Sequence, residues 1–141
     1  MTAAIARNAR VLALTVVLTA TSGSLFYSEV LKYNPCLLCW YQRIFMYPQT
    51  VLLGLGILKN DRHVADYSLA FSLIGGIIAA FHYWGQVSAS SILPCPVVGF
   101  SASCSQRFSL EYGYITIPMM SLTAFTLIGA LMVIYRLRKS R

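Results

Sequence analysis

Four long apolar stretches follow one another along the chain, separated by segments that carry polar residues. They run over residues 11–27, about 37–58, 67–84 and 115–135. Each is close to the roughly 20 residues that an α-helix needs to cross the hydrocarbon core of a bilayer. The pattern predicts an all-α integral membrane protein, folded as one domain over residues 1–141 and built as a bundle of four transmembrane helices.

The composition points the same way. Of the 141 residues, 57% are hydrophobic and 11% are charged, and the mean hydropathy is +0.66. A soluble domain carries about 25% charged residues, so a surface that faces water on all sides is excluded. The net charge of +7 is typical of many nucleic-acid-binding domains, but the basic residues flank the apolar stretches and form no stripe. We therefore expect membrane lipid as a partner and no nucleic acid.

The first stretch has an alternative interpretation. Arg7 and Arg10 precede an apolar run that gives way to small residues through Ser24, a pattern that also fits a secretory signal peptide. The apolar run resumes at residues 25–27 and reaches spanning length, which favours a membrane helix. Loss of this segment would leave the orientation of the later stretches unchanged.

The distribution of the eleven Lys and Arg residues predicts the orientation. With the N-terminus in the cytoplasm, the inner segments carry eight of them: Arg7, Arg10, Lys59, Arg62, Arg136, Arg138, Lys139 and Arg141. The outer segments carry Lys32, Arg43 and Arg107. Because positive charge concentrates on the cytoplasmic side, we expect both termini and residues 59–66 there. The outer loops are then residues 28–35 and 85–114, and all four cysteines fall on the extracytoplasmic side of the cell membrane.

The cysteines form two pairs, Cys36-x-x-Cys39 and, farther along, Cys95 and Cys104. Four such residues can bind zinc, but the spacing of the second pair is too long for a zinc knuckle, so we expect no metal site. Structural disulfides would suit an extracytoplasmic compartment. A disulfide across C-x-x-C, however, closes a very small loop and adds little stability. This favours a pair that is oxidised and reduced in turn.

The residues around the first pair also favour reactivity. Asn34 and Pro35 precede it, as a capping residue and a first-turn proline would, so both cysteines should lie in the first turn of a helix. There the helix dipole favours the thiolate. Arg43 follows Cys39 by four positions and can lie on the same face, where its charge would stabilise the anion. The alternative is an arginine that extends to the membrane surface.

A dithiol at a membrane surface needs an electron acceptor. The chain has neither the G-x-G-x-x-G pattern of dinucleotide binding nor a C-x-x-C-H haem attachment site, so a lipid-soluble quinone is the simplest acceptor. His82, near the outer end of the third stretch, can donate a hydrogen bond to a quinone carbonyl, and Gln42 is a second candidate. The alternative for His82 is a satisfied interfacial histidine.

These residues resemble a known family. The segment P-C-L-L-C-W-Y-Q-R at residues 35–43, with His82, the Cys95/Cys104 pair and Pro118 at the start of the last stretch, is similar to the DsbB family, in particular its short BdbC-type members. The resemblance covers nearly the whole chain. It implies a four-helix bundle that reoxidises a DsbA-like extracytoplasmic thioredoxin-fold partner and reduces menaquinone or ubiquinone, which supports disulfide bond formation in exported proteins.

The resemblance also implies roles for individual residues. Cys95 would form the mixed disulfide with the partner and Cys104 would be its mate in the loop. Cys39 would be the thiolate that faces the quinone, supported by Arg43. Two features depart from the proteobacterial members: the segment between Cys95 and Cys104 is short, and Gln42 stands where those members have a carboxylate.

Two alternatives remain open. The vitamin K epoxide reductase type is also a compact bundle with a quinone-facing C-x-x-C, but there the motif follows the loop pair, whereas here it opens the second stretch. The other alternative is a membrane scaffold whose disulfides are structural. Structural disulfides should stay oxidised whatever the respiratory state, so a count of free thiols would separate a scaffold from a redox-active protein.

Overall fold

A computed structural model of the chain describes residues 2–32, 34–88 and 116–140, and these residues are almost entirely helical. The helices are α1 (Thr2–Leu25), continued by a π-helical turn, η1 (Phe26–Val30), then α2 (Leu37–Leu58), α3 (Val64–Val87) and α4 (Ile117–Ser140). No strand occurs in the described ranges. The expectation of an all-α chain is therefore confirmed.

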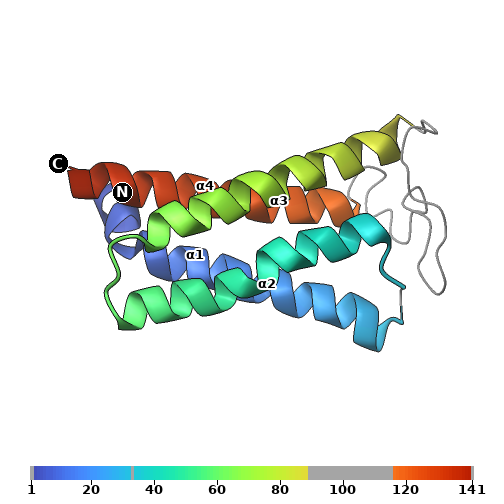
Figure 1. The fold of residues 1–141 in the computed structure, drawn as a ribbon, viewed down its shortest axis with the longest axis horizontal. Helices are drawn as coiled ribbons and strands as arrows, with labels where there is room; N and C mark the ends of the chain where they lie inside the picture. The colour runs from blue at the N-terminus through green and yellow to red at the C-terminus, as the bar shows by residue number, and fades with distance from the viewer. Residues whose placement is uncertain (1, 33, 89–115, 141) are drawn as a thin grey trace.

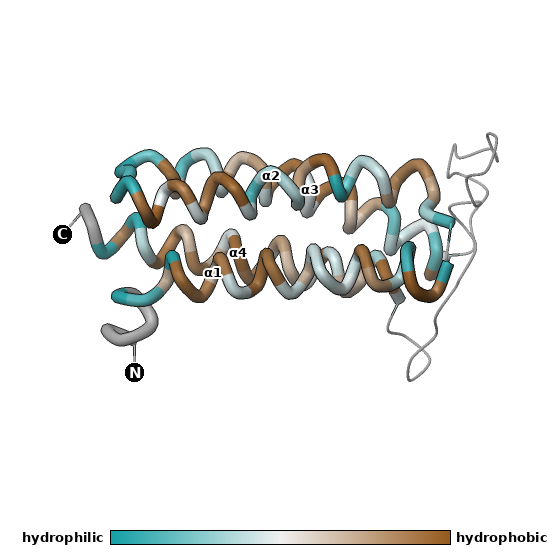
Figure 2. Tube along the Cα trace, turned by 90° about the horizontal axis from the view of Figure 1, so that it is seen from below, coloured by the Kyte–Doolittle hydropathy of each residue, from teal (hydrophilic) through white to brown (hydrophobic). Residues whose placement is uncertain are grey.

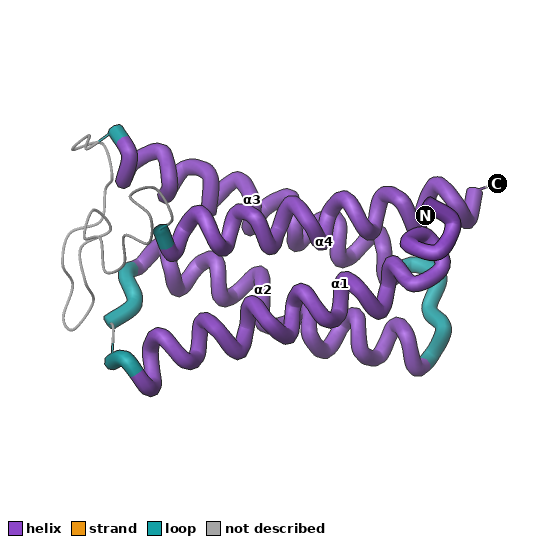
Figure 3. The backbone as a smooth tube through the Cα atoms, turned by 180° about the vertical axis from the view of Figure 1, so that it is seen from behind, coloured by secondary structure: helices purple, strands orange, loops and turns teal. Residues whose placement is uncertain are grey.

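The helices lie side by side along one long axis (Figure 1). Each packs against two neighbours in the order α1, α2, α3, α4 and back to α1, while α2 and α4 touch only slightly across the diagonal. The start of α1, the end of α4 and the connection between α2 and α3 share one end of the bundle. The connection between η1 and α2 lies at the other end (Figure 3). We call these the terminal end and the cysteine end.

The outer surface of the bundle is apolar. Three segments of the described chain are long and apolar enough to cross a membrane: Arg7–Val30, Val64–Val87 and Ile117–Arg138. Large apolar side chains on all four helices face outward, among them Val11, Leu18, Val51, Leu73, Ile77, Leu127 and Val133. Hydrophilic residues gather toward the ends (Figure 2). A surface of this kind is stable in lipid, so the chain is a multi-pass membrane protein.

Helix α2 is not among those segments. Its polar side chains turn inward: Gln42 is 6% exposed and Gln49 is fully buried. The Oε1 atom of Gln49 accepts hydrogen bonds from Ser68 Oγ at 2.9 Å and Ser72 Oγ at 3.3 Å. Because such polar groups are satisfied inside the bundle, their presence does not prevent α2 from facing lipid on its other side.

The most extensive helix contact of the bundle lies between α3 and α4. Phe125, Ile128 and Met132 of α4 are at most 1% exposed. A Cβ atom on Gly75 of α3 would overlap the ring of Phe125, so the absence of a side chain at this position lets the two helices approach closely. Small residues at helix contacts are the usual means of packing in membranes.

Helices α1, α3 and α4 are longer than the apolar stretches that predict them, whereas α2 has the predicted bounds. The expected outer loop 28–35 begins only after Val30, because η1 carries the helix on, and α3 extends to Val87 instead of ending at residue 84. Hydropathy marks the part of a helix that faces lipid, whereas the backbone hydrogen bonds continue into polar residues. At η1, for example, the backbone N–H of Leu31 donates to Phe26 O at 3.2 Å. Pro118 lies in the first turn of α4, as expected.

Charged residues join the helices at the terminal end. Arg136 on α4 pairs with Asp66 on α3 at 3.1 Å. Arg10 on α1 donates to Asn60 Oδ1 at 3.0 Å and stacks over the Tyr135 ring at 5.0 Å. These contacts connect α1 and α4 to the α2–α3 hairpin where the helices leave the apolar part of the bundle.

Candidate functional site

The first cysteine pair lies where α2 begins. Cys36 is the capping residue, with extended backbone angles of −74° and 170°, and its Sγ accepts a hydrogen bond from the backbone N–H of Cys39 at 3.3 Å. Only Cys39 lies within the first turn. The prediction that Asn34 caps the helix and that both cysteines lie in its first turn is therefore wrong. The physical reason is that the sulfur itself satisfies one of the unpaired amides at the helix start.

The two sulfurs are placed for disulfide exchange. Cys36 and Cys39 are free thiols in this structure, and their Sγ atoms lie 2.6 Å apart, closer than non-bonded sulfurs in ordinary contact. Cys36 is 3% exposed, whereas Cys39 is half-buried. The pair can therefore close into a disulfide with only small side-chain movements.

His82 of α3 reaches the buried sulfur of the pair. The ring is 1% exposed, and its Nε2 lies 3.7 Å from Cys36 Sγ. On the other side of the ring, Nδ1 pairs with Gln42 Nε2 at 3.0 Å, and Gln86 Nε2 lies 3.4 Å from Nε2. As the sequence predicts, His82 lies near one end of its helix, and in the structure this is the end beside the first cysteine pair, where its ring contacts a sulfur and two amides.

These contacts make Cys36 acidic. Its pKa is lowered from 9.0 to about 5, chiefly because the Cys39 thiol donates a hydrogen bond to its sulfur. Burial opposes this change, while the hydrogen bond and charge of His82 and the backbone N–H of Cys39 assist it. The lowered pKa favours the thiolate of Cys36, the reactive form in thiol chemistry.

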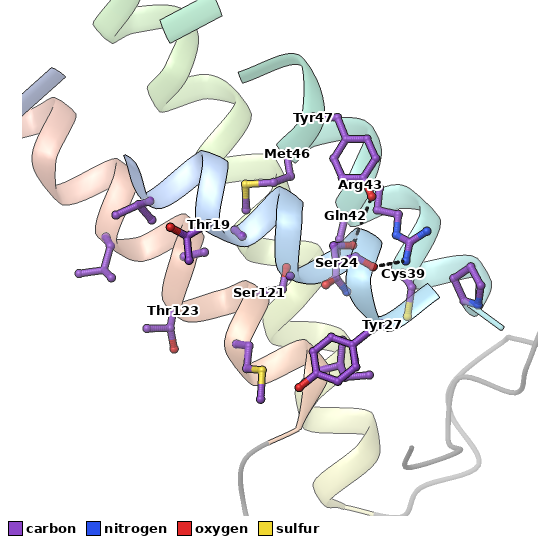
Figure 4. Close-up of a pocket in the computed structure, with 18 of the residues that line it drawn as sticks. Thr19, Ser24, Tyr27, Cys39, Gln42, Arg43, Met46, Tyr47, Ser121 and Thr123 are labelled. Carbon is purple, nitrogen blue, oxygen red and sulfur yellow. Dashed lines mark hydrogen bonds between the residues drawn. The ribbon is translucent and has the colours of Figure 1, made fainter. Parts of the chain in front are cut away.

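A cavity of about 540 Å³ opens beside Cys39 (Figure 4). Its walls come from α1, the first residues of η1, the start of α2, and α4. Gln42 and Arg43 line it together with Cys39, whereas Cys36 and His82 lie behind this wall. Cavities of this volume are typical of sites for small organic ligands and cofactors.

Hydrogen-bonding groups gather at one part of the cavity. The half-buried Arg43 donates through Nη2 to the backbone carbonyl of Ser24 at 3.2 Å, and its guanidinium lies 5.4 Å from the centre of the Trp40 ring. Tyr47, one turn farther along α2, donates to Ser24 Oγ at 3.3 Å. Both side chains appear near Ser24 in Figure 4. This part of the cavity thus presents a cation and hydroxyl groups next to Cys39.

The remainder of the cavity is apolar. Val16, Ala20, Ala124 and Leu127 line it between α1 and α4. Threonines in the wall have their hydroxyls occupied by carbonyls of their own helix, as for Thr19 Oγ1, which donates to Thr15 O at 2.9 Å. Their methyl groups are therefore left to face a ligand, and a long apolar chain can lie there at little cost.

The structure brings together five of the seven residues that the sequence singles out: Cys36, Cys39, Gln42, Arg43 and His82. The other two, Cys95 and Cys104, lie outside the described residues. Sequence analysis missed Ser24 and Tyr47. Tyr47 follows Arg43 by four positions on the same face of α2, a spacing that could have revealed it, whereas nothing in the sequence indicates that Ser24 of α1 faces α2.

A membrane helix bundle with a polarised dithiol beside a ligand-sized cavity is typical of membrane thiol–disulfide oxidoreductases. The comparison with known families agrees: the family model described as "Disulfide bond formation protein DsbB" matches residues 6–135. The chain belongs to the DsbB family, as the resemblance predicts, and this membership favours disulfide formation over the vitamin K epoxide reductase alternative.

Relatives of similar length support the assignment. "Probable disulfide formation protein C" of Halalkalibacterium halodurans is 45% identical over 111 residues, which cover 79% of this chain and 80% of the relative. "Disulfide bond formation protein C" of Bacillus subtilis is 42% identical over 127 residues, 89% of this chain and 90% of the relative. No solved structure matches the chain significantly.

Proposed function

We propose that the chain is a protein-dithiol:quinone oxidoreductase. It takes electrons from a DsbA-like extracytoplasmic thiol oxidase and delivers them to menaquinone or ubiquinone in the membrane. The observation that carries this proposal is the position of Cys39. Its sulfur contacts the buried sulfur of Cys36 on one side, and on the other side it lines the cavity that Arg43 also lines.

The cavity suits a quinone in both of its parts. A quinone head has two carbonyl oxygens that accept hydrogen bonds, and Arg43, whose guanidinium has further N–H donors beyond the one used on Ser24, lines the same cavity as Cys39. The isoprenoid tail needs an apolar path, which residues such as Ala20 and Leu127 offer between α1 and α4. A charged donor is well suited to a carbonyl that gains negative charge as it is reduced.

The arrangement of the two sulfurs supports a direction for electron flow. As Cys39 transfers two electrons to the quinone, the Cys36 thiolate attacks the Cys39 sulfur and the disulfide forms. The Cys39 proton and one proton from solvent complete the quinol, so one thiolate, one thiol, one quinone and one proton give one disulfide and one quinol. Cys36 is the better nucleophile of the pair because its pKa is the lowered one.

The second cysteine pair supplies the other half of the cycle. We propose that the partner thiolate attacks Cys95 of a Cys95–Cys104 disulfide, and that exchange then reduces the Cys36–Cys39 disulfide. The names of the relatives, which refer to disulfide formation, support a partner of this kind. A strongly oxidising partner near −120 mV must pass its electrons to a still stronger acceptor, which quinone provides and the glutathione pools at about −180 mV or below do not.

This scheme requires four spans with both termini in the cytoplasm. The basic residues at the terminal end, among them Arg7, Arg10, Lys59, Arg136 and Arg138, favour the cytoplasm for that end. The cysteine end is then extracytoplasmic. Helix α2 has 22 residues, a length sufficient to span the bilayer, and its most polar side chains point to the bundle interior.

The proposal is tested by capturing the partner. In a Cys104→Ser variant Cys95 is a lone thiol, and its thiolate can attack the disulfide of the oxidised partner to give the same mixed disulfide with release of one partner thiol. Because Cys104 is absent and cannot resolve this adduct, it should accumulate in membranes quenched with acid. Mass spectrometry should identify an exported thioredoxin-fold protein in the adduct. The matched control, Cys95→Ser with Cys104→Ser, should give none. A Cys104→Ser chain that gives no adduct while wild type still oxidises exported dithiols would contradict the assigned route.

A further inference from the structure

The redox site contains a third possible metal ligand, His82, which disulfide exchange does not require. One atom each from Cys36, Cys39 and His82 lie within 4.8 Å of one another. Two thiolates and an imidazole are the ligands that zinc prefers, and a site with three protein ligands leaves a fourth position for water. The four cysteines predict zinc poorly from spacing alone. His82 of α3 changes this, because it completes the set from a distant part of the chain.

The sulfur–nitrogen distance already fits a tetrahedral ion, and the sulfur–sulfur distance can be brought to fit by rotation of one side chain. With Zn–S near 2.3 Å and Zn–N near 2.0 Å, a sulfur and a nitrogen bound to the same zinc lie about 3.5 Å apart. Cys36 Sγ and His82 Nε2 lie 3.7 Å apart. The sulfurs, at 2.6 Å, must separate by about 1 Å to reach the roughly 3.8 Å of a zinc dithiolate. Cys39 borders the cavity, so its side chain has room to rotate.

The outer contact of the imidazole is also of the right kind. Histidine ligands of metals are usually held through the second ring nitrogen by a polar partner. In this site Gln42 pairs with Nδ1 at 3.0 Å and directs Nε2 toward the sulfurs. Rotation of the Gln42 amide by half a turn would offer its carbonyl to an N–H at Nδ1, because the oxygen and nitrogen of the amide then exchange places.

Charge favours the ion as well. Two thiolates carry two negative charges, which a divalent cation neutralises, so the occupied site is neutral apart from its water. A neutral cluster is much less costly at a buried position than a dithiolate. Binding displaces one or two thiol protons to solvent, according to how many of the sulfurs are already thiolates. The disulfide has no thiolate and cannot bind the ion in this way.

We propose that the reduced Cys36–Cys39 pair and His82 form a binding site for a thiophilic divalent cation, Zn²⁺ in the first instance, and that the bound ion holds the pair reduced. Metal binding is independent of the proposed function. Inhibition rests on it, because an ion on both sulfurs prevents disulfide formation and so stops electron delivery to quinone.

The direct test counts ligands in the folded protein. A Cys95→Ser, Cys104→Ser chain, purified in detergent and reduced with a phosphine, is loaded with one equivalent of Zn²⁺. X-ray absorption at the zinc edge should show two sulfurs near 2.3 Å and one imidazole near 2.0 Å. Four sulfurs, no imidazole or no bound zinc after desalting would each overturn the proposal, and none of these results depends on quinone activity.

A titration with matched variants tests the role of His82. Removal of this ligand in His82→Ala should weaken Zn²⁺ binding by at least the roughly 10–100-fold that loss of an outer-shell partner costs. His63→Ala changes the exposed histidine at the terminal end and should leave binding unchanged. The oxidised chain should not bind. If His82→Ala does not stay monodisperse, His82→Asn replaces it. If the His82 variant and the unchanged chain bind Zn²⁺ with equal affinity, the two cysteines alone hold the ion and the proposed three-ligand site is refuted.

Zinc inhibition separates this proposal from the proposed function. Micromolar Zn²⁺ should stop dithiol-dependent quinone reduction in the wild-type chain, and a chelator should restore it. If the chain binds zinc through two sulfurs and an imidazole but never reduces quinone, the proposed function fails and the metal site stands. If quinone reduction proceeds unchanged in saturating Zn²⁺, the claim that the ion holds the pair reduced is wrong.

Discussion

Replacement of Arg43 by methionine tests whether the cavity binds the quinone head. Methionine keeps the length and most of the volume of the side chain but removes the charge and its donors. A guanidinium has five N–H donors, and the bond to the Ser24 carbonyl at 3.2 Å uses one of them. Arg43 therefore retains donors for a ligand at the Cys39 end of the cavity.

The size of the effect follows from the kind of bond that is lost. A hydrogen bond from a charged donor contributes about 1.5–3 kcal/mol, and each 1.4 kcal/mol is about tenfold in binding. The stacking on Trp40 adds little, because that ring is 51% exposed. We expect Arg43→Met to raise the KM for a short-chain quinone by about 10- to 100-fold, with an unchanged KM for the dithiol substrate.

The assay is steady-state quinol formation in detergent, with the dithiol and the quinone varied in turn. Arg138→Met, the same change at an exposed residue of the terminal end, is the control and should behave as wild type. The quinone KM of Arg43→Lys should lie between those of Arg43→Met and the control, because lysine retains the charge but lacks the planar set of N–H donors of a guanidinium. An unchanged quinone KM in Arg43→Met would refute the reasoning and leave Arg43 as an interfacial arginine.

Three further predictions concern reactivity, packing and orientation. In the reduced chain, alkylation of Cys36 should rise with a midpoint near pH 5 instead of 9, because only the thiolate reacts and it forms as the pH passes the pKa; a midpoint near 9 would contradict the hydrogen bond from the Cys39 thiol. Gly75→Val should destabilise the bundle by about 1–3 kcal/mol in a thermal melt, whereas Gly76→Ala, whose added Cβ meets its nearest neighbour at 3.7 Å, should cost little. A membrane-impermeant maleimide on intact, mildly reduced cells should label Cys95 but not Asn60→Cys until lysis; the reverse pattern would invert the topology.

The sequence predicts the local part of the site well. Cys36, Cys39 and Arg43 lie within eight residues at the start of α2, so spacing alone predicts that they lie close together, although it does not predict that Cys36 caps the helix. The helical fold and the family follow from the apolar stretches and the same motif. The sequence also identifies His82 as a site residue. Helical periodicity does not tell which neighbour it faces, however, and in the structure it contacts Cys36 and Gln42.

The parts that the sequence does not predict depend on packing between helices. Ser24 reaches the site because α1 packs against α2 in a register that no single-chain pattern specifies. The cap at Cys36 depends on a sulfur accepting a backbone N–H, a role usually taken by oxygen. Helix ends are also underestimated, because hydrogen bonds carry α3 to Val87 beyond the apolar run from which it is predicted.

A single-turnover experiment tests the central claim most directly, namely that the Cys36–Cys39 dithiol reduces quinone. A fully reduced, quinone-free Cys95→Ser, Cys104→Ser chain is mixed with one equivalent of quinone and quenched with acid. Our account predicts one quinol formed and two thiols lost per chain, with a Cys36–Cys39 disulfide found by peptide mapping and no reaction in the corresponding Cys39→Ser chain. Quinol formation without loss of thiols, or at the same rate in Cys39→Ser, would contradict it.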